Sequence, residues 1–366
     1  MVPGLEDSNS GGPRSPRERA SESPSVNFQG QKPVIAVIGA GSWGTVLALH
    51  LARIERQVRL WVRRPELAEE IRTRRQNSYY LPGFSLPDSI DIASDPEPVL
   101  DNAGSIVCVV PSHTVREIFT HLKPYIQPGT AILSASKGIE NETCLLMTDV
   151  ILQTLGEGHR PQVAALSGPS FALEVARGDP TAAVVASADR RIARNFQNDL
   201  SGHNIRIYTN GDLIGTQVCG AVKNIIAIAA GIVNGLGFGS NTSAGLITRG
   251  LAEVKRLCVA AGGQPDTPSG LAGLGDLVLT STGELSRNRR LGIELGGGRK
   301  LDEILAGTHF VAEGVRTTRS TFTLAQRLRV EMPITEQMHE VLYAGKAPLE
   351  AIRHLMERGL KSESGN

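Results

Sequence analysis

The chain has 366 residues and a formal net charge of +1, and it is 40% apolar and 20% charged. This length suits two domains with ample apolar material for their cores, and the near-neutral charge gives no global field to attract nucleic acid or a membrane surface. The sequence contains no run of 18 or more apolar residues, so no membrane span is predicted. The four cysteines lack the paired spacing of disulfides or a zinc site, so we expect no metal and a cytoplasmic location.

The first 31 residues are rich in Ser, Pro, Gly and charge, with few bulky apolar side chains. This composition predicts a disordered N-terminal extension. It lacks the apolar core of a signal peptide, and its four acidic residues argue against a transit peptide. Residues 361–366 are expected to form a short polar tail.

The continuous apolar run at 34–38 predicts a strand buried on both faces. It leads into a G-x-G-x-x-G at 39–44, and a helical pattern follows to Ile54. Gly39 would permit a tight turn, Gly41 would let backbone approach a pyrophosphate, and Gly44 would let helix and strand pack closely. The helix N-terminus then favours the phosphates. A dinucleotide site is therefore predicted, with a plain glycine turn as the alternative.

A second strand is predicted at 57–62. Sites specific for NAD usually carry an acidic residue at its end, to hold the ribose 2′-hydroxyl. Arg63 and Arg64 stand there instead and suit a 2′-phosphate, so NADP is favoured over NAD. The alternative is a pair of solvated surface arginines. A loop with Tyr79 and Tyr80 follows, where a ring could line the cofactor cleft.

Further apolar runs predict strands at 105–110, 131–134, 163–166, 182–187 and 205–208. Ser112 is expected to cap a helix that runs through Leu122. Ligands of open parallel sheets gather beyond the carboxyl ends of strands, and Lys137, Gly168 and Ser170 follow such ends. Lys137 would suit an anionic substrate or a developing oxyanion, with a surface loop lysine as the alternative.

Residues 209–236 have the length and periodicity of one long helix, which Asn210 or Asp212 would cap. Its bulky apolar residues fall on one broad arc. The opposite arc is small and polar, with Lys223 in its middle, which is typical of a pocket wall. Alternatively, this arc packs on a neighbouring helix and Lys223 reaches solvent. Helical patterns dominate from here on, which predicts a helical second domain with the substrate in the cleft between domains.

Two polar, glycine-rich stretches interrupt the helical part, at 270–290 and 310–315. The first holds Asp276 among Leu and Gly, and then the run Ser286-Arg287-Asn288. A guanidinium beside neutral donors suits a phosphate monoester, although a solvated basic turn has the same composition. The sequence contains no Ser-His-Asp arrangement, Walker A motif or internal repeat of 20–50 residues.

Seven stretches together resemble the bacterial-type NAD(P)-dependent glycerol-3-phosphate dehydrogenases: GAGSWGT at 39–45, SKG at 136–138, LSGPSFALEVARGDPTA at 166–182, GAVKNIIAIAAGI at 220–232, SAGLITRGLAEV at 243–254, GLAGLGDLVLTST with SRNRRLG at 270–292, and AEGVRTT at 312–318. The resemblance implies an α/β fold, with an N-terminal Rossmann dinucleotide-binding domain at 32–211 and an all-helical C-terminal domain at 212–360. Val222 stands where the family would have leucine, a mild departure.

The resemblance also implies the activity: reversible oxidation of sn-glycerol 3-phosphate to dihydroxyacetone phosphate, which supplies glycerol 3-phosphate for glycerophospholipid synthesis. Lys223 would be the catalytic general base and acid. The cofactor, NADP or NAD, would contact Gly39, Gly41, Ser42, Trp43, Gly44, Arg63, Arg64, Lys137, Ala172, Arg287, Val311 and Glu313. The substrate would contact Lys137, Gly168, Ser170, Lys223, Asp276, Ser286, Arg287 and Asn288.

Three other functions remain compatible with the residues. A related two-domain dehydrogenase of hydroxy acids could share the Rossmann half and the helix lysine, but it would need a carboxylate site in place of Ser-Arg-Asn. A non-catalytic NADP(H) sensor and a scaffold whose partner binds the N-terminal extension are the others. The oligomeric state is left open, with a homodimer as one option.

Overall fold

The computed structural model describes residues 33–307, 313–360, 362 and 363, which belong to one compact unit. The predicted extension at 1–31, Val311 and most of the predicted tail lie outside the described residues.

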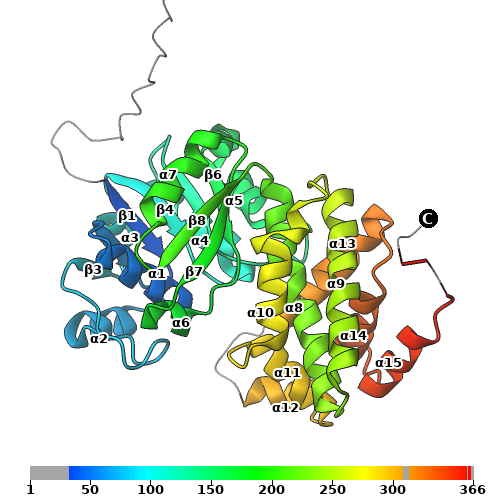
Figure 1. Ribbon diagram of the computed structural model, residues 1–366. Coiled ribbons are helices and arrows are strands. Elements are labelled where there is room, and N and C mark those ends of the chain that lie inside the picture. Colours follow the sequence, from blue (N-terminus) through cyan, green and yellow to red (C-terminus); the bar gives the residue numbers. More distant parts are fainter. Residues whose placement is uncertain (1–32, 308–312, 361, 364–366) are drawn as a thin grey trace, which may run out of the picture. The chain divides into compact units, whose positions relative to one another are not determined.

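An eight-stranded sheet with the order β3-β2-β1-β4-β5-β6-β7-β8 forms the first half of the described chain (Figure 1). Neighbouring strands are parallel except β6 and β7, which are antiparallel. The sheet confirms the predicted α/β class. The strands are β1 (Val34–Ile38), β2 (Val58–Trp61), β3 (Ile90–Ala93), β4 (Ala103–Cys108), β5 (Ala131–Ser134), β6 (Val163–Ser167), β7 (Thr181–Ala186) and β8 (Ile205–Asn210).

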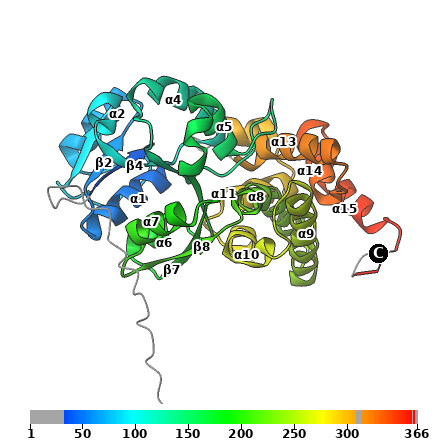
Figure 2. The ribbon, with the colours of Figure 1, turned by 90° about the horizontal axis from the view of Figure 1, so that it is seen from above.

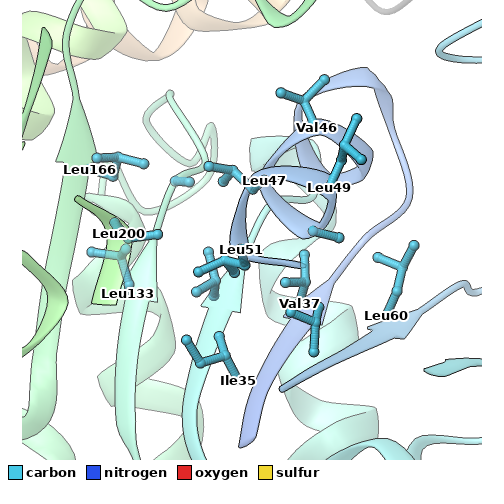
Figure 3. Packing of buried hydrophobic residues seen from close by; sticks show 14 of the residues in the cluster. Ile35, Val37, Val46, Leu47, Leu49, Leu51, Leu60, Leu133, Leu166 and Leu200 are labelled. Carbon is cyan, nitrogen blue, oxygen red and sulfur yellow. The ribbon is translucent and has the colours of Figure 1, made fainter. Parts of the chain in front are cut away.

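Helices cover both faces of this sheet because alternate strand residues point to opposite sides. Ile35 and Val37 of β1 join one core cluster, while Ala36 and Ile38 join the other. Figure 3 shows the first cluster, in which side chains of the first helix gather beside β1. The helices of that cluster are α1 (Ser42–Arg53), α2 (Pro65–Arg74), α6 (Ala172–Arg177) and α7 (Arg190–Leu200). Those of the second are α3 (Pro96–Leu100), α4 (Val115–Leu122) and α5 (Met147–Leu155).

The start of α4 differs from the prediction. Ser112 does not cap it; the residue opens a short 3-10 turn, η1 (Ser112–Thr114), and α4 begins at Val115. The reason is local, since Pro111 lies just before Ser112 and fixes an extended entry into a tight turn. Two further 3-10 turns, η2 (Lys123–Tyr125) and η3 (Glu157–Gln162), follow α4 and α5.

The second half of the described chain is helical, as predicted. Its long helix α8 (Leu213–Gly235) packs against α9, α10, α11 and α13, and Figure 2 views it nearly end-on between its neighbours. The others are α9 (Ser240–Ala260), η4 (Thr267–Ser269), the π-helical turn η5 (Leu271–Gly275), α10 (Asp276–Thr282), α11 (Arg287–Gly296), α12 (Leu301–Ala306), α13 (Glu313–Leu328), α14 (Pro333–Tyr343) and α15 (Pro348–Met356).

Asp212 is the residue that caps α8. Its Oδ1 accepts from the Gly215 amide at 2.8 Å, which satisfies one of the free N–H groups of the first turn. Its other oxygen accepts from the Gln264 amide at 2.7 Å and from the Thr267 hydroxyl at 2.6 Å. One buried carboxylate therefore fixes both the start of α8 and the loop after α9.

The small face of α8 packs on a neighbouring helix over part of its length, as one interpretation predicts, but Lys223 is buried and does not reach solvent as that interpretation also predicts. Near its C-terminal end, a Cβ on Gly231 would lie 2.1 Å from the Arg289 carbonyl oxygen, and one on Gly292 would lie 2.0 Å from the Ile228 carbonyl oxygen. This part packs backbone to backbone on α11. Lys223, about two turns before Gly231, points instead into a polar cluster.

Within the described residues, α8 is also the one helix long and apolar enough to cross a membrane. Most of its apolar window, 89%, is buried among other parts of the protein. A core helix meets the same criteria of length and composition.

The close packing of α8 on α11 can be tested by a pair of glycine substitutions within helices. Gly231→Ala should destabilise the protein by about 1–3 kcal/mol, because the new methyl group would overlap the Arg289 carbonyl. Gly245→Ala, on the exposed side of α9 with no atom within 4 Å of its Cβ, should stabilise it by about 0.5–1 kcal/mol. Denaturant unfolding measures both, and equal effects would contradict the close approach.

Candidate active site

The turn between β1 and α1 requires glycine at two of its three glycine positions, Gly39 and Gly44. Gly39 has φ +111°, and a Cβ there would lie 2.7 Å from the Val109 carbonyl oxygen. A Cβ on Gly44 would lie 1.9 Å from the Gly39 carbonyl oxygen. Gly41, in contrast, faces open space, with no atom within 4 Å of its Cβ position. The backbone is thus packed tightly on the protein side and left accessible at Gly41.

The N-terminus of α1 lies at this accessible point. Its N-cap residue is Gly41, which supplies no side-chain cap, and its first turn holds no acidic residue. The first N–H groups of a helix lack intrahelical partners and favour negative charge. The free N–H groups at this turn are therefore suited to bind a pyrophosphate group.

Arg287, at the start of α11, reaches this turn from the helical part of the chain. Its Nη2 donates to the Ser42 hydroxyl oxygen at 3.1 Å, and that hydroxyl donates to the Tyr80 carbonyl oxygen at 2.7 Å. A guanidinium beside the positive end of α1 adds to the attraction for an anion there. Trp43, the next residue, packs half-buried against the core cluster of the sheet.

Arg63 and Arg64 are exposed and follow β2, as the sequence predicts. The Arg64 guanidinium lies 5.2 Å from the ring centroid of Tyr79 and 5.9 Å from that of Tyr80. The two rings contact each other edge to face. Stacking on aromatic faces orients Arg64 and leaves its N–H groups able to bind a phosphate.

Two lysines and one aspartate from distant parts of the chain meet in a second cluster. Lys137, after β5, donates to Asp276 Oδ2 at 2.7 Å and to the Gly168 carbonyl oxygen at 3.2 Å. Lys223, from α8, donates to the other oxygen of Asp276. Asp276 is only 1% exposed. The carboxylate therefore bridges the sheet and the helical part.

The glycine-rich stretch before Asp276 explains how the carboxylate comes to be buried. Residues 271–275 form the π-helical turn η5, and a Cβ on Gly273 would lie 2.0 Å from the Pro268 carbonyl oxygen. Such turns are rare and are frequent at functional sites. Glycine permits this close contact, and α10 then starts with Asp276 facing the lysines.

The charges of this cluster shift one another's pKa values. The pKa of Lys223 is lowered to about 8, chiefly by burial, while Asp276 raises it and Lys137 lowers it. Burial alone would raise the pKa of Asp276, but the two ammonium groups hold it below its usual value. With a pKa near 8, roughly a tenth of Lys223 is neutral at pH 7.

Glu313 opens α13 near these groups, and burial raises the pKa of its carboxyl group above the usual range. Its Oε1 accepts from the Ser112 amide at 3.4 Å. The charges of Lys137, Lys223 and Arg287 all act on it and partly offset the burial effect. The predicted Glu313 therefore lies with the lysines, while Val311 is outside the described residues.

Gly168 and Ser170 lie beside Lys137 beyond the end of β6. The Ser170 hydroxyl donates to the Gly168 carbonyl oxygen at 3.1 Å, the oxygen that also accepts from Lys137. Gly168 has φ +125°, and a Cβ there would lie 2.9 Å from Ala183 Cα. Ala172 is half-buried and starts α6.

In the run at 286–288, two side chains make hydrogen bonds within the helical part, and the third, Arg287, is exposed. Ser286 caps α11 by accepting from the Arg289 amide at 3.2 Å. Asn288 donates to Asn224 Oδ1 at 3.0 Å and accepts from the Gly314 amide at 3.1 Å. Of the three, Arg287 alone is seen to reach the glycine turn.

Two polar residues of the cluster were missed in the sequence. Thr280 accepts from Lys223 Nζ at 2.8 Å and donates to Asp276 at 3.3 Å. Its position four residues after Asp276 on one helix face was an available signal. Asn224, beside Lys223, links α8 to Asn288, and nothing local distinguishes it from an ordinary core polar residue.

Comparisons with known proteins identify the family of the chain. The family description "NAD-dependent glycerol-3-phosphate dehydrogenase N-terminus" matches residues 34–193, and the corresponding C-terminus matches residues 212–353.

Individual relatives cover nearly the whole described chain. Glycerol-3-phosphate dehydrogenase (NAD(P)+) from Citrifermentans bemidjiense is 50% identical over 329 residues, covering 90% of this chain and 98% of the relative. The enzyme of that name from Koribacter versatilis is 50% identical over 331 residues, with the same coverage of both. The crystal structure of glycerol-3-phosphate dehydrogenase from Coxiella burnetii has 42% identity and a TM-score of 0.85, covering 89% of this chain and 99% of that one. The chain therefore belongs to the NAD-dependent glycerol-3-phosphate dehydrogenase family.

Proposed function

We propose that this protein catalyses the reversible NAD(P)-dependent oxidation of sn-glycerol 3-phosphate to dihydroxyacetone phosphate. The observation that carries the proposal is the buried amine of Lys223, held against Asp276 and Thr280 with a pKa near 8. The family relatives named for this reaction support the substrate.

The glycine turn would hold the cofactor. Gly39, Gly41 and Gly44 shape the backbone, and Ser42 and Trp43 begin the helix whose free N–H groups suit a pyrophosphate. Ala172 would contact the cofactor, and Glu313 would approach its nicotinamide end. When bound, the NAD or NADP supplies the hydride acceptor for oxidation and the hydride donor for reduction.

Lys223 would handle the proton of the reaction. As a neutral amine it accepts the proton of the substrate C2 hydroxyl, and as an ammonium it returns the proton in the reverse direction. Asp276 and Thr280 hold its nitrogen in place. Asp276 also keeps the pKa of Lys223 from falling further, so both protonation states of the lysine are accessible near neutral pH.

The positive charge of the site suits a phosphorylated substrate. Lys137 would polarise the C2 oxygen, with Gly168 and Ser170 beside it. Arg287 would pair with the substrate phosphate close to the cofactor. Among the described residues, the Ser286 hydroxyl hydrogen and one Asn288 amide N–H have no acceptor, and these donors could complete the phosphate site.

We further propose that NADP is preferred over NAD, through Arg63 and Arg64. Their exposure at the end of β2 and the stacked orientation of Arg64 support this. We place the boundary between the two domains at about residue 211, between β8 and α8.

The physiological role we propose is supply of glycerol 3-phosphate for glycerophospholipid synthesis. We propose a cytoplasmic location, which the four free cysteines support because thiols stay reduced there.

Replacing Lys223 tests the proposed catalyst. Lys223→Ala should lower kcat by on the order of 10²–10⁴-fold or more, because proton transfer loses its placed group. NADPH binding, followed by fluorescence, should be nearly unchanged. Lys123→Ala, a change to an exposed lysine on η2, is the matched control and should keep full activity. Turnover at the parent rate in Lys223→Ala would remove this residue from the mechanism.

The pH dependence tests the charge coupling. For glycerol 3-phosphate oxidation, kcat/KM should rise with pH and level off above about 8, since the neutral amine is the base. Reduction of dihydroxyacetone phosphate should decline over the same range. In Asp276→Asn the inflection should move to lower pH, because losing the negative neighbour disfavours the ammonium form. An inflection that stays or moves upward would contradict the coupling.

Coenzyme preference tests the two arginines. Arg63→Ala with Arg64→Ala should raise KM for NADPH at least about tenfold more than KM for NADH, since a phosphate contact to a charged group is worth about 1.5–3 kcal/mol. Steady-state kinetics with both coenzymes measures the difference. Arg59→Ala, on the preceding strand, serves as control. Equal changes in the two KM values would exclude recognition of a 2′-phosphate by these residues.

A further inference from the structure

The last unit of the sheet, β7-α7-β8, points the opposite way from the rest. It is a parallel strand–helix–strand unit like β1-α1-β2, but β7 is antiparallel to β6. The end of β7 therefore lies beside the start of β6, where the Ser187 hydroxyl donates to the Val163 carbonyl oxygen at 2.8 Å. The carboxyl ends of β7 and β8 thus meet at the sheet edge opposite to the glycine turn.

A cavity of about 330 Å³ lies at this second edge. Its lining comes from the carboxyl ends of β7 and β8, with the residue after each, and from the first two turns of α7. It includes Ser187, Arg190, Arg194, Thr209, Asn210 and Gly211. Ligands of parallel strand–helix–strand units gather at such carboxyl ends. The volume is within the range of pockets that hold small molecules.

The charge of the lining is positive. Arg190 and Arg194 are four residues apart on α7 and so share a helix face, and no carboxylate is among the residues that line the cavity. Arg194 also has an interaction of its own within the protein, so Arg190 is the first candidate to bind a ligand. The nearby Asp189 is already engaged, since it caps α7 and pairs with Arg191 at 2.9 Å.

We propose that this cavity binds a small oxyanion ligand, a phosphate or carboxylate compound, at a site separate from the active site. Arg190 and Arg194 would pair with its charge, and the hydroxyl of Thr209 and the amide of Asn210 would supply neutral hydrogen bonds. The proposal does not depend on the dehydrogenase activity, because its residues belong to neither the glycine turn nor the lysine cluster.

The cavity adjoins the start of the helix that carries Lys223. Gly211 lines the cavity and Asp212, the next residue, caps α8. From there α8 runs beside β6 to Gly220, whose Cβ position is 2.8 Å from the Ser167 hydroxyl. Lys223 follows, about 16 Å along the helix from Asp212 at a rise of about 1.5 Å per residue. Occupancy of the cavity would thus act on the first turn of the helix that holds the catalytic amine.

Calorimetry with inorganic pyrophosphate tests the site, using full-length protein saturated with NADPH so that the glycine turn is filled. Arg190→Glu, alone and with Arg194→Glu, should weaken pyrophosphate binding at least about tenfold by reversing the charge. Arg191→Glu is the matched control, since this neighbour on α7 is exposed, pairs with Asp189 and does not line the cavity. Its binding should stay within about threefold of the parent's. The proposal is overturned if the Arg190→Glu protein binds pyrophosphate like the parent.

Hydrogen exchange locates the binding independently and shows that the variants fold. Pyrophosphate should slow exchange at 187–194 and 209–215 in the parent and in Lys223→Ala, but not in Arg190→Glu. Protection confined to 39–45 would assign pyrophosphate to the cofactor turn and reject the site. Citrate in place of pyrophosphate distinguishes the two chemistries: equal protection indicates a general oxyanion site, and none indicates a phosphate site.

Discussion

The bridge between Asp276 and the two lysines is the interaction on which the rest of the site depends. Taking the Lys223 ammonium group out of water costs several kcal/mol, and the partly buried Lys137 ammonium group repels it. A carboxylate that bonds one with each oxygen offsets much of this cost. The same bridge connects the sheet, through Lys137, to the helical part, through Lys223. It therefore links the sheet to the helical part and also raises the pKa of the Lys223 amine against the effect of burial.

Helix α8 holds Lys223 in place through contacts at its start, middle and end. Its start is fixed by Asp212, its middle carries Lys223, and its end packs on α11 through Gly231. Small residues let α11 and β6 approach its backbone, so the helix has little freedom to rotate or slide. A lysine placed on such a helix keeps its nitrogen in one position, which proton transfer requires.

Because the β7-α7-β8 unit is inverted, carboxyl ends of strands lie at both ends of the sheet, and positive charge lies near each. At one, the free N–H groups of α1 and the guanidinium of Arg287 lie together and would suit phosphates. At the other, Arg190 lies by a cavity next to the first residue of α8. Because α8 extends from one edge towards the other, a single rigid element connects the two positions.

The sequence by itself determined the local elements. The glycine turn, the predicted strands and the long helix follow from short-range patterns, because turn geometry and side-chain periodicity are local properties. It missed β3, whose four residues carry only a weak pattern, and it misassigned the cap of α4. The antiparallel direction of β7 relative to β6 could not be predicted from the sequence, because strand direction is set by packing between strands. Tertiary structure alone brought Lys137 to Asp276, which is 139 residues away. It also gave Ser286 and Asn288 structural hydrogen bonds, since a helix cap and a phosphate ligand need the same polar side chains.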